Sequence, residues 1–253
     1  MDARAMVRLL ANTVAIPGGH EEKKRFLMAG ICDLVRADSW VWTLGCGFRE
    51  GGGQTCVNFL HHGFDDDRFA RYLEGLEDRE ASAVAWPFYE ALMAGEENRL
   101  LTMTRREIDP DDRSSAGRVG ELWQRADIGP IVLSGRVLDE QSLSLIAVYR
   151  RVGDAPFELR EKTIAHIMLS EVRWLHEIGW PVDRGAEVPH LAPRQRMVLN
   201  LLLDGMDRKR IAAHLDLSLN TVHGYIRDLY RTLGVNSHAV LMKRFGFSKL
   251  SDS

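Results

Sequence analysis

The stretch Ser218-Leu-Asn-Thr-Val-His-Gly-Tyr-Ile-Arg-Asp-Leu-Tyr-Arg-Thr-Leu233 predicts an amphipathic helix over Leu219–Leu233. Its apolar residues recur at steps of four, three and four, which places them on one stripe: Val222, Ile226, Leu229 and Leu233. The opposite side and its flanks carry mainly polar groups and only one acidic residue: Asn220, His223, Gly224, Arg227, Asp228 and Arg231. A helix held from behind by a small core, with donors on its outer face, suits a DNA major groove.

The glycine in this face strengthens that interpretation. Glycine inside a helix costs about 1 kcal/mol relative to alanine, so Gly224 indicates that something approaches the helix closely. The alternative is an ordinary solvated helix face, which explains the residues singly but not the whole set.

Three further helical patterns surround this helix: Arg194–Asp204, Arg208–Leu215 and Ser237–Phe245. Gly205 stands where a helix end favours a residue that can adopt a positive φ. Asp207 and Ser218 are expected to be the N-caps of the second and third helices, because their side chains can accept from the first backbone N–H groups. The pattern predicts an all-α domain of four helices over 191–253.

Four motifs in this region resemble the LuxR/GerE-type helix-turn-helix, and together they cover about the last quarter of the chain: Leu191-Ala-Pro-Arg-Gln-Arg-Met-Val-Leu199, Arg208-Lys-Arg-Ile-Ala-Ala-His-Leu215, Ser218-Leu-Asn-Thr-Val-His-Gly-Tyr225 and Leu233-Gly-Val235. The resemblance implies that Leu219–Leu233 is the recognition helix and that Ser237–Phe245 pairs two copies. The positions that usually reach bases correspond to His223, Gly224 and Arg227. Those near phosphates correspond to Lys209, Asn220, Tyr225 and Arg231, and Ser218 and Thr221 complete the predicted DNA-binding set.

The chain departs from this family's pattern at four positions. Ala192 replaces a usual Thr, so the first helix is expected to lack its side-chain N-cap, at a cost of about 1 kcal/mol. Gln195 and Arg210 replace usual Glu residues, and His223 replaces a frequent Lys. These changes leave DNA binding in place, but the neutral His223 weakens any base preference carried over from the family.

The distribution of charge agrees with nucleic-acid binding at one end. The 253 residues carry a net charge of −3, but from Leu191 onward ten Lys and Arg face five Asp and Glu, while the preceding part holds 23 against 31. A basic tail on an acidic body is expected where one domain binds DNA.

Cysteine usage and hydropathy indicate a cytoplasmic protein. Cys32, Cys46 and Cys56 are odd in number and lack C-x-x-C spacing, which disfavours a disulfide framework or a zinc module and fits a reducing compartment. The first residues do not resemble a signal peptide, and no run of about eighteen apolar residues occurs. We therefore expect a cytoplasmic protein without a membrane span.

Upstream of Leu191 the sequence predicts alternating helices and strands. The predicted helices are Ala3–Val14, Glu21–Val35, Phe69–Leu76, Pro87–Met93, Glu121–Ala126 and a long one over Phe157–Ile178. The predicted strands are Trp40–Phe48 and Gln54–His61, joined by a turn at Arg49–Gly53, and the hairpin Ile131–Leu138 and Ser142–Arg150. The segment Gly95–Ser115 is polar and is expected to be mainly loop.

This order predicts an α+β sheet domain over 1–178 and a linker over 179–190. It looks like the GAF/PAS-type sensor fold, and Val148–Phe157 is similar to the run that precedes the last helix in such sensors. The resemblance implies a sensor and dimerisation domain, made of a sheet with flanking helices, that controls the DNA-binding domain.

What the sensor domain senses is left open by the sequence. All six tryptophans precede the DNA-binding region, and they either enclose a small organic ligand or simply fill the core. The spaced Trp/Tyr/Asp pattern of acyl-homoserine-lactone receptors is not traceable, and the acidic residues of a phosphorylated receiver are not apparent. A protein partner is the remaining alternative.

Metal, cofactor and enzyme chemistry receive little support. His61 and His62 precede Asp65-Asp-Asp67, but adjacent residues on a strand point to opposite faces and cannot readily share one ion. No G-x-S-x-G elbow, phosphate-cradling loop or H-E-x-x-H helix is present. The sequence therefore predicts a non-enzymatic regulator without a cofactor, acting as a homodimer on double-stranded DNA.

Overall fold

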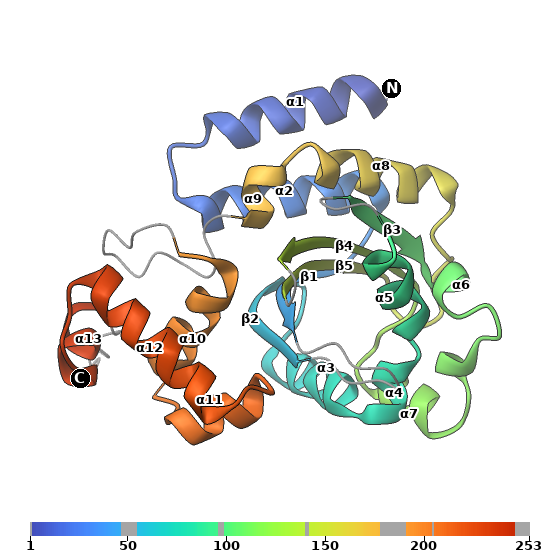
Figure 1. Cartoon of the computed structure of the whole chain (residues 1–253). Coiled ribbons are helices and arrows are strands. Elements are labelled where there is room, and N and C mark those ends of the chain that lie inside the picture. Colours follow the sequence, from blue (N-terminus) through green and yellow to red (C-terminus); the bar gives the residue numbers. More distant parts are fainter. Residues whose placement is uncertain are drawn as a thin grey trace, which may run out of the picture. The chain divides into compact units, whose positions relative to one another are not determined.

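The computed structural model of the chain describes residues 2–46, 55–95, 99–139, 142–177, 191–203 and 205–245. The chain divides into two compact units, Met1–Glu177 and Ile178–Ser253 (Figure 1). The predicted turn at Arg49–Gly53 and the predicted linker at 179–190 lie outside the described residues.

The N-terminal unit is built on one antiparallel sheet of five strands in the order β2-β1-β5-β4-β3. The strands are β1 Ser39–Cys46, β2 Thr55–His62, β3 Leu100–Thr104, β4 Ile131–Asp139 and β5 Ser142–Tyr149. The central strand β5 is buried along its whole length. The predicted α+β class is confirmed, because β1, β2, β4 and β5 occur where the sequence predicts strands.

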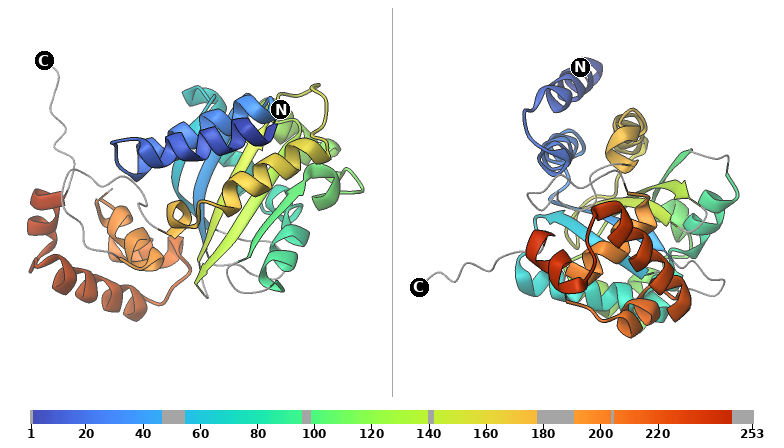
Figure 2. Two further views of the ribbon diagram at one scale, coloured as in Figure 1. Left: turned by 90° about the horizontal axis from the view of Figure 1, so that it is seen from above. Right: turned by 60° about the vertical axis from the view of Figure 1, so that its left-hand side comes forward.

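Helices cover both faces of this sheet (Figures 1 and 2). On one side lie α1 Asp2–Ala15, α2 His20–Val35, α8 Leu159–Ser170 and α9 Arg173–Glu177. On the other side and around its edge lie α3 Asp66–Glu77, α4 Arg79–Ala83, α5 Trp86–Met93, α6 Arg105–Ile108, the 3₁₀ turn Arg113–Ser115 and α7 Gly117–Arg125. None of the described helices is long and apolar enough to cross a membrane.

Two predictions for this unit are wrong. The segment Gly95–Ser115 is not mainly loop, because it contains the edge strand β3 and the helix α6. The strand is short and rich in Thr, and its backbone pairs with β4 alone, so it needs no long apolar run. The predicted helix Phe157–Ile178 breaks after Ser170, and the break lets His176 of α9 reach the sheet.

A hydrogen-bonded chain of buried side chains fixes α9 to the sheet. Trp42 Nε1 donates to Ser144 Oγ at 2.9 Å, and Ser144 Oγ lies 2.8 Å from His176 Nδ1. His176 Nε2 donates to Leu169 O at 3.0 Å, which places the ring proton on Nε2 and leaves Nδ1 to accept from Ser144. Trp42 also stacks at a tilt on His176, with ring centroids 5.2 Å apart. The two tryptophans of β1, Trp40 and Trp42, are fully buried core residues.

Arg68 of α3 is the buried charge that ties the loops around the sheet together. Its guanidinium donates to five acceptors: Gly63 O at 2.6 Å, Asp127 O at 2.8 Å, Ala126 O at 3.1 Å, Ser39 Oγ at 3.3 Å and Asp38 Oδ2 at 3.3 Å. It also lies 4.5 Å above the ring of Phe64. One side chain therefore holds the start of β1, the connection from β2 to α3, and the connection from α7 to β4.

The C-terminal unit consists of four helices: α10 Pro193–Leu203, α11 Arg208–His214, α12 Leu219–Leu233 and α13 His238–Phe245. Each lies within a residue or two of its predicted bounds, and the predicted all-α class is confirmed. Its core is made of aliphatic side chains from all four helices: Met197, Val198, Leu201, Leu202, Ile211, Leu215, Val222, Ile226, Leu229, Leu233 and Leu241.

Replacing the buried guanidinium should destabilise the N-terminal unit strongly. We expect Arg68→Met to lower the free energy of unfolding by about 3–5 kcal/mol, because Asp38 and four further acceptors lose their partner. Arg71→Met on the same helix is the matched control, since its side chain is 46% exposed and should change stability by less than about 1 kcal/mol. Urea unfolding of both variants measures the difference, and equal effects would contradict the role assigned to Arg68.

The buried histidine should make stability depend on pH. Burial, the largest effect, lowers the pKa of His176 to about 3. The unfolded chain therefore binds a proton between about pH 6.5 and pH 3 that the folded chain does not, so stability falls as pH falls through this range, by up to about 1.4 kcal/mol per pH unit. We expect the His176→Gln variant to lose this contribution to the pH dependence of the free energy of unfolding. Unfolding free energies of both proteins at several pH values test it, and parallel curves would refute it.

Candidate DNA-binding surface and ligand pocket

The helix α12 begins and ends where its sequence predicts. Ser218 Oγ accepts from the backbone N–H of Thr221 at 3.0 Å, which confirms the predicted N-cap. At the other end Gly234 has φ 62, and its N–H donates to the carbonyls of Tyr230 and Arg231. The helix is thus capped at both ends by its own sequence.

The preceding helices hold α12 from behind. Asp207 caps α11 as predicted, with Oδ1 accepting from the N–H groups of Lys209 and Arg210 at 2.9 Å, and Gly205 has φ 81. Arg194 of α10 is buried and donates through Nη2 to Leu215 O at 3.2 Å, where α11 ends. The cap of α11 and the bond from Arg194 to the end of α11 therefore help to fix the outer face of α12.

The start of α10 shows what replaces the missing cap. Ala192 has no side-chain acceptor, but its own N–H donates to Gln195 Oε1 at 3.2 Å. This bond is the reciprocal half of a capping box, and it survives the exchange of Glu for Gln.

The predicted DNA-binding residues share the outer surface of α11 and α12. Val222, Ile226, Leu229 and Leu233 form the buried stripe, as predicted. The predicted residues are exposed or half-buried: Lys209, Ser218, Asn220, Thr221, His223, Gly224, Tyr225, Arg227 and Arg231. The hydroxyl of Ser218 is used as the helix cap, so its contribution there is to position the first turn.

The two arginines of this face differ in their surroundings. Arg231 Nη2 lies 3.0 Å from Asp228 Oδ1, and its side chain is 77% exposed. Arg227 has no ion-pair partner among the residues that the structure describes, and it is exposed. A guanidinium without an internal partner can turn both of its donor edges outward.

Among the described residues, no contact requires a glycine at position 224. A Cβ built on Gly224 would meet no atom within 4 Å, and its φ is not positive. By contrast, a Cβ on Gly75 of α3 would lie 2.6 Å from the indole of Trp123. Gly75 therefore has a packing reason, whereas Gly224 on α12 has none within the described structure.

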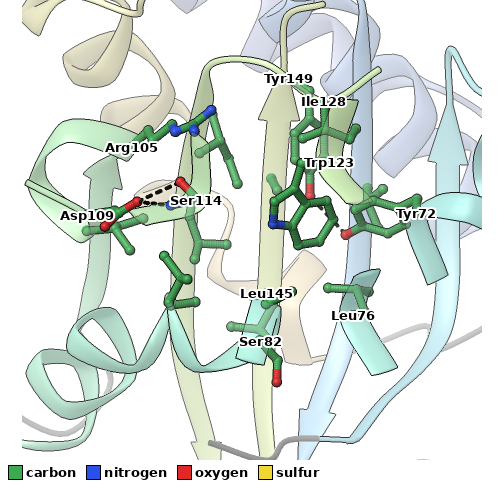
Figure 3. Close-up of a pocket in the computed structure, with 18 of the residues that line it drawn as sticks. Tyr72, Leu76, Ser82, Arg105, Asp109, Ser114, Trp123, Ile128, Leu145 and Tyr149 are labelled. Atoms are coloured by element: carbon green, nitrogen blue, oxygen red, sulfur yellow. Dashed lines mark hydrogen bonds between the residues drawn. The ribbon is translucent and has the colours of Figure 1, made fainter. Parts of the chain in front are cut away.

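The N-terminal unit contains a partly open cavity of about 120 Å³ between its sheet and the helices α3 to α7 (Figure 3). Its floor is made by side chains of β1, β4 and β5: Val41, Thr43, Ile131, Leu133, Leu145, Ala147 and Tyr149. Its walls include Tyr72 and Leu76 of α3, Ile108 of α6 and Trp123 of α7. A cleft of about 670 Å³ adjoins it and shares Arg105, Asp109 and Trp123.

The polar groups of the cavity are few and mostly paired. The hydroxyls of Tyr72 and Tyr149 lie 2.9 Å apart, and burial raises the pKa of both, so both stay neutral. Burial raises the pKa of Asp109, but hydrogen bonds from Ser114 and Arg113 outweigh this and the pKa lies below its usual value. Its Oδ2 accepts from Ser114 N and Oγ at 2.7 and 2.6 Å, and Oδ1 from Arg113 N at 3.1 Å.

The sequence did not predict this cavity residue by residue. Tyr72, Trp123 and Tyr149 come from three distant elements, and only the upstream tryptophans signalled an aromatic enclosure. Trp123 does line the cavity, while Trp40 and Trp42 fill the core.

His61, Cys32 and Cys56 lie in packed surroundings. His61 stacks on Phe69 with ring centroids 3.8 Å apart, and no metal-binding cluster occurs within the described part of the chain. Burial raises the pKa of the Cys32 thiol to about 12, while Cys56 lines the cavity.

Comparison with known proteins identifies the C-terminal region. Residues 189–245 match the family model of bacterial regulatory proteins, luxR family. The probable transcriptional regulator ycf29 of Porphyra purpurea is 35% identical over 54 residues, which are 21% of this chain and 26% of that protein. The chain therefore spans about a quarter of the length of this curated relative.

Solved structures with low identity are also similar to this chain. The crystal structure of Escherichia coli SdiA matches with a TM-score of 0.41 and 13% identity over 95% of this chain and 96% of that one. The N-acylhomoserine lactone dependent factor CepR2 of Burkholderia cenocepacia matches with a TM-score of 0.44 and 11% identity over 69% and 92%. The family match, with the capped and supported α12, identifies residues 189–245 as a LuxR-type helix-turn-helix domain.

Proposed function

We propose that the chain is a sequence-specific transcriptional regulator that binds double-stranded DNA through α12. The observation that carries this proposal is Gly224, a helical glycine on the exposed face that no contact within the described chain requires. A helix interior loses about 1 kcal/mol at such a glycine, and close approach of a DNA groove accounts for it. The exposed donors around it supply contacts to bases and phosphates.

The residues divide into two roles in this proposal. Arg227, with both guanidinium edges available, reads bases together with His223. Lys209, Asn220, Tyr225 and Arg231 position the helix on the phosphates, as the family resemblance implies. Two copies bind as a homodimer to half-sites about one helical turn apart, with α13 and the N-terminal unit as candidates for the pairing surface.

The N-terminal unit acts in this proposal as a GAF/PAS-like sensor that controls DNA binding by means of a small ligand. The support is the cavity with an apolar floor and a few polar groups, since such sites bind small organic molecules. A protein partner is disfavoured because a small, mainly apolar cavity suits a small molecule better than a macromolecular surface.

In this proposal the protein catalyses no reaction, needs no cofactor and acts in the cytoplasm. In the cavity the one carboxylate is used in four hydrogen bonds and the tyrosines are neutral, which supports binding rather than acid–base chemistry. An enzyme would need a convergent acid, base or nucleophile there.

Replacing Gly224 by alanine should raise the stability of the protein but weaken its binding to DNA. We expect Gly224→Ala to raise the free energy of unfolding by about 0.5–1 kcal/mol, because the new methyl group meets no atom and the helix gains propensity. The same methyl group should weaken binding to an operator obtained by genomic selection. Thermal unfolding and fluorescence anisotropy on one protein preparation measure both effects. Tighter DNA binding together with higher stability would contradict close approach at this position.

The two arginines should respond differently to replacement by alanine. Arg227→Ala should cost about 1–3 kcal/mol on the selected operator and relax the preference at one base pair. Arg231→Ala should weaken all sequences about equally and reduce the salt dependence by about one phosphate contact. Thr232→Ala, at an exposed position in the last turn of α12 that is not among the predicted DNA-binding residues, is the control. An unchanged base preference in Arg227→Ala would show that this residue is not the base-reading one.

A further inference from the structure

The short helix α9 is attached to the sheet by a chain of buried hydrogen bonds. Trp42 Nε1 donates to Ser144 Oγ at 2.9 Å, and Ser144 gives its one hydroxyl proton to His176 Nδ1 at 2.8 Å. His176 Nε2 donates to Leu169 O at 3.0 Å, in the last turn of α8, where a helix leaves carbonyl groups without an intrahelical partner. One side chain of α9 therefore joins the strand β5 to the end of α8.

The helix α9 depends on its contacts with the rest of the unit. It consists of the five residues Arg173–Glu177, and an isolated helix of that length is unstable in water. Its inward side chains Leu175 and His176 are both 0% exposed. Trp174 adds a contact to α2, with its ring centroid 6.0 Å from that of His20 (Figure 1). We therefore expect two states of α9, one docked and helical, the other released and unfolded.

The sheet residues that hold α9 alternate with residues that line the cavity. Trp42 lies between Val41 and Thr43 on β1, and both of these line the cavity. Ser144 precedes Leu145 on β5, and Leu145 lines the cavity as well (Figure 3). Successive side chains of a strand point to opposite faces. The cavity and the docking site of α9 therefore share the same stretches of backbone.

The place of α9 in the chain connects it to the DNA-binding unit. It is the last described element of the N-terminal unit, and the next described residue, Leu191, belongs to the C-terminal unit. The chain reaches the DNA-binding helices only by way of α9. Docking of α9 therefore fixes the point at which the chain leaves the N-terminal unit.

From these contacts we propose that α9 couples the cavity to DNA binding: a molecule that fills the cavity strengthens the docking of α9 on β5, and the state of α9 sets the affinity for DNA. The inference rests on the proposed ligand-controlled DNA binding, and it adds the element that transmits the control. Its direction follows from linkage. Release of α9 uncovers Trp42 and Ser144 and loosens β1 and β5, so a molecule bound against these strands favours the docked state.

Removal of one hydroxyl group tests the docking in the full-length protein. Ser144→Ala removes the group that Trp42 and His176 share, so the amide hydrogens of α9 should exchange with deuterium about 10-fold faster. Ser134→Ala is the matched control, because Ser134 is also a buried strand serine, but its hydroxyl bonds Thr102 of β3. This control should leave the exchange of α9 within about twofold of the unchanged protein.

Filling the cavity should have the opposite effect. Benzene is the probe, because an apolar cavity of about 150 Å³ binds it, and Ala147→Leu fills the cavity from β5 without any ligand. Each should slow the exchange of α9. The affinity for an operator obtained by genomic selection should change at least about 5-fold in Ser144→Ala, and in the opposite direction when the cavity is filled. Because coupling is reciprocal, benzene should bind Ser144→Ala more weakly than Ser134→Ala.

The following results would overturn the inference: equal exchange of α9 in Ser144→Ala and Ser134→Ala, no slowing of this exchange by benzene or by Ala147→Leu, an unchanged operator affinity in Ser144→Ala, or shifts of operator affinity in the same direction. Exchange of α9 is measured without DNA, and the substitutions need no ligand. Absence of benzene binding or of sequence-specific DNA binding therefore counts against the proposed function, while the exchange of α9 in the variants still decides whether docking responds to the cavity.

Discussion

The N-terminal unit depends on the alternation of side chains along β1 and β5. Successive residues of a strand point to opposite faces, and the two strands pair in register from Ser39 opposite Tyr149 onward. Val41, Leu145 and Tyr149 are thereby committed to the cavity, while the side chains between them face the α2–α9 layer. A shift of one residue would move the tyrosine hydroxyl into the wrong layer and open the cavity floor. The same register places Ser144 between Trp42 and His176. The pairing of β1 with β5 therefore fixes the cavity floor on one face of the sheet and the Trp42–Ser144–His176 hydrogen bonds on the other.

Two buried charged side chains of this unit have their hydrogen-bonding groups matched with partners. Arg68 meets five acceptors and Asp109 accepts four hydrogen bonds. Such satisfaction is the ordinary state of buried polar groups.

The sequence predicts a feature well when the residues that determine it are close together in the chain, and poorly when they are far apart. The bounds of α12 were predictable because stripe, cap and glycine all lie within sixteen consecutive residues. The strand β3 was missed, since an edge strand is defined by a partner thirty residues away and its own Leu-Leu-Thr-Met-Thr gives no clear alternation. The break after Ser170 was missed for a similar reason, because the periodicity of Phe157–Ile178 continues through it and only the distant Ser144 explains why His176 turns inward. The cavity needs side chains from several strands and helices at once, so no window of sequence contains it.

The helix α12 breaks a local rule at one position, and this supports the proposal that it binds DNA. Gly224 lowers helix stability at a position where alanine would fit without a contact. No contact among the described residues offsets this cost, although the cap and the apolar stripe of the helix follow the rules closely. A sequence that is locally consistent elsewhere concentrates its exceptions where function imposes them. A DNA groove beside Gly224 would turn this unfavourable local choice into a favourable contact.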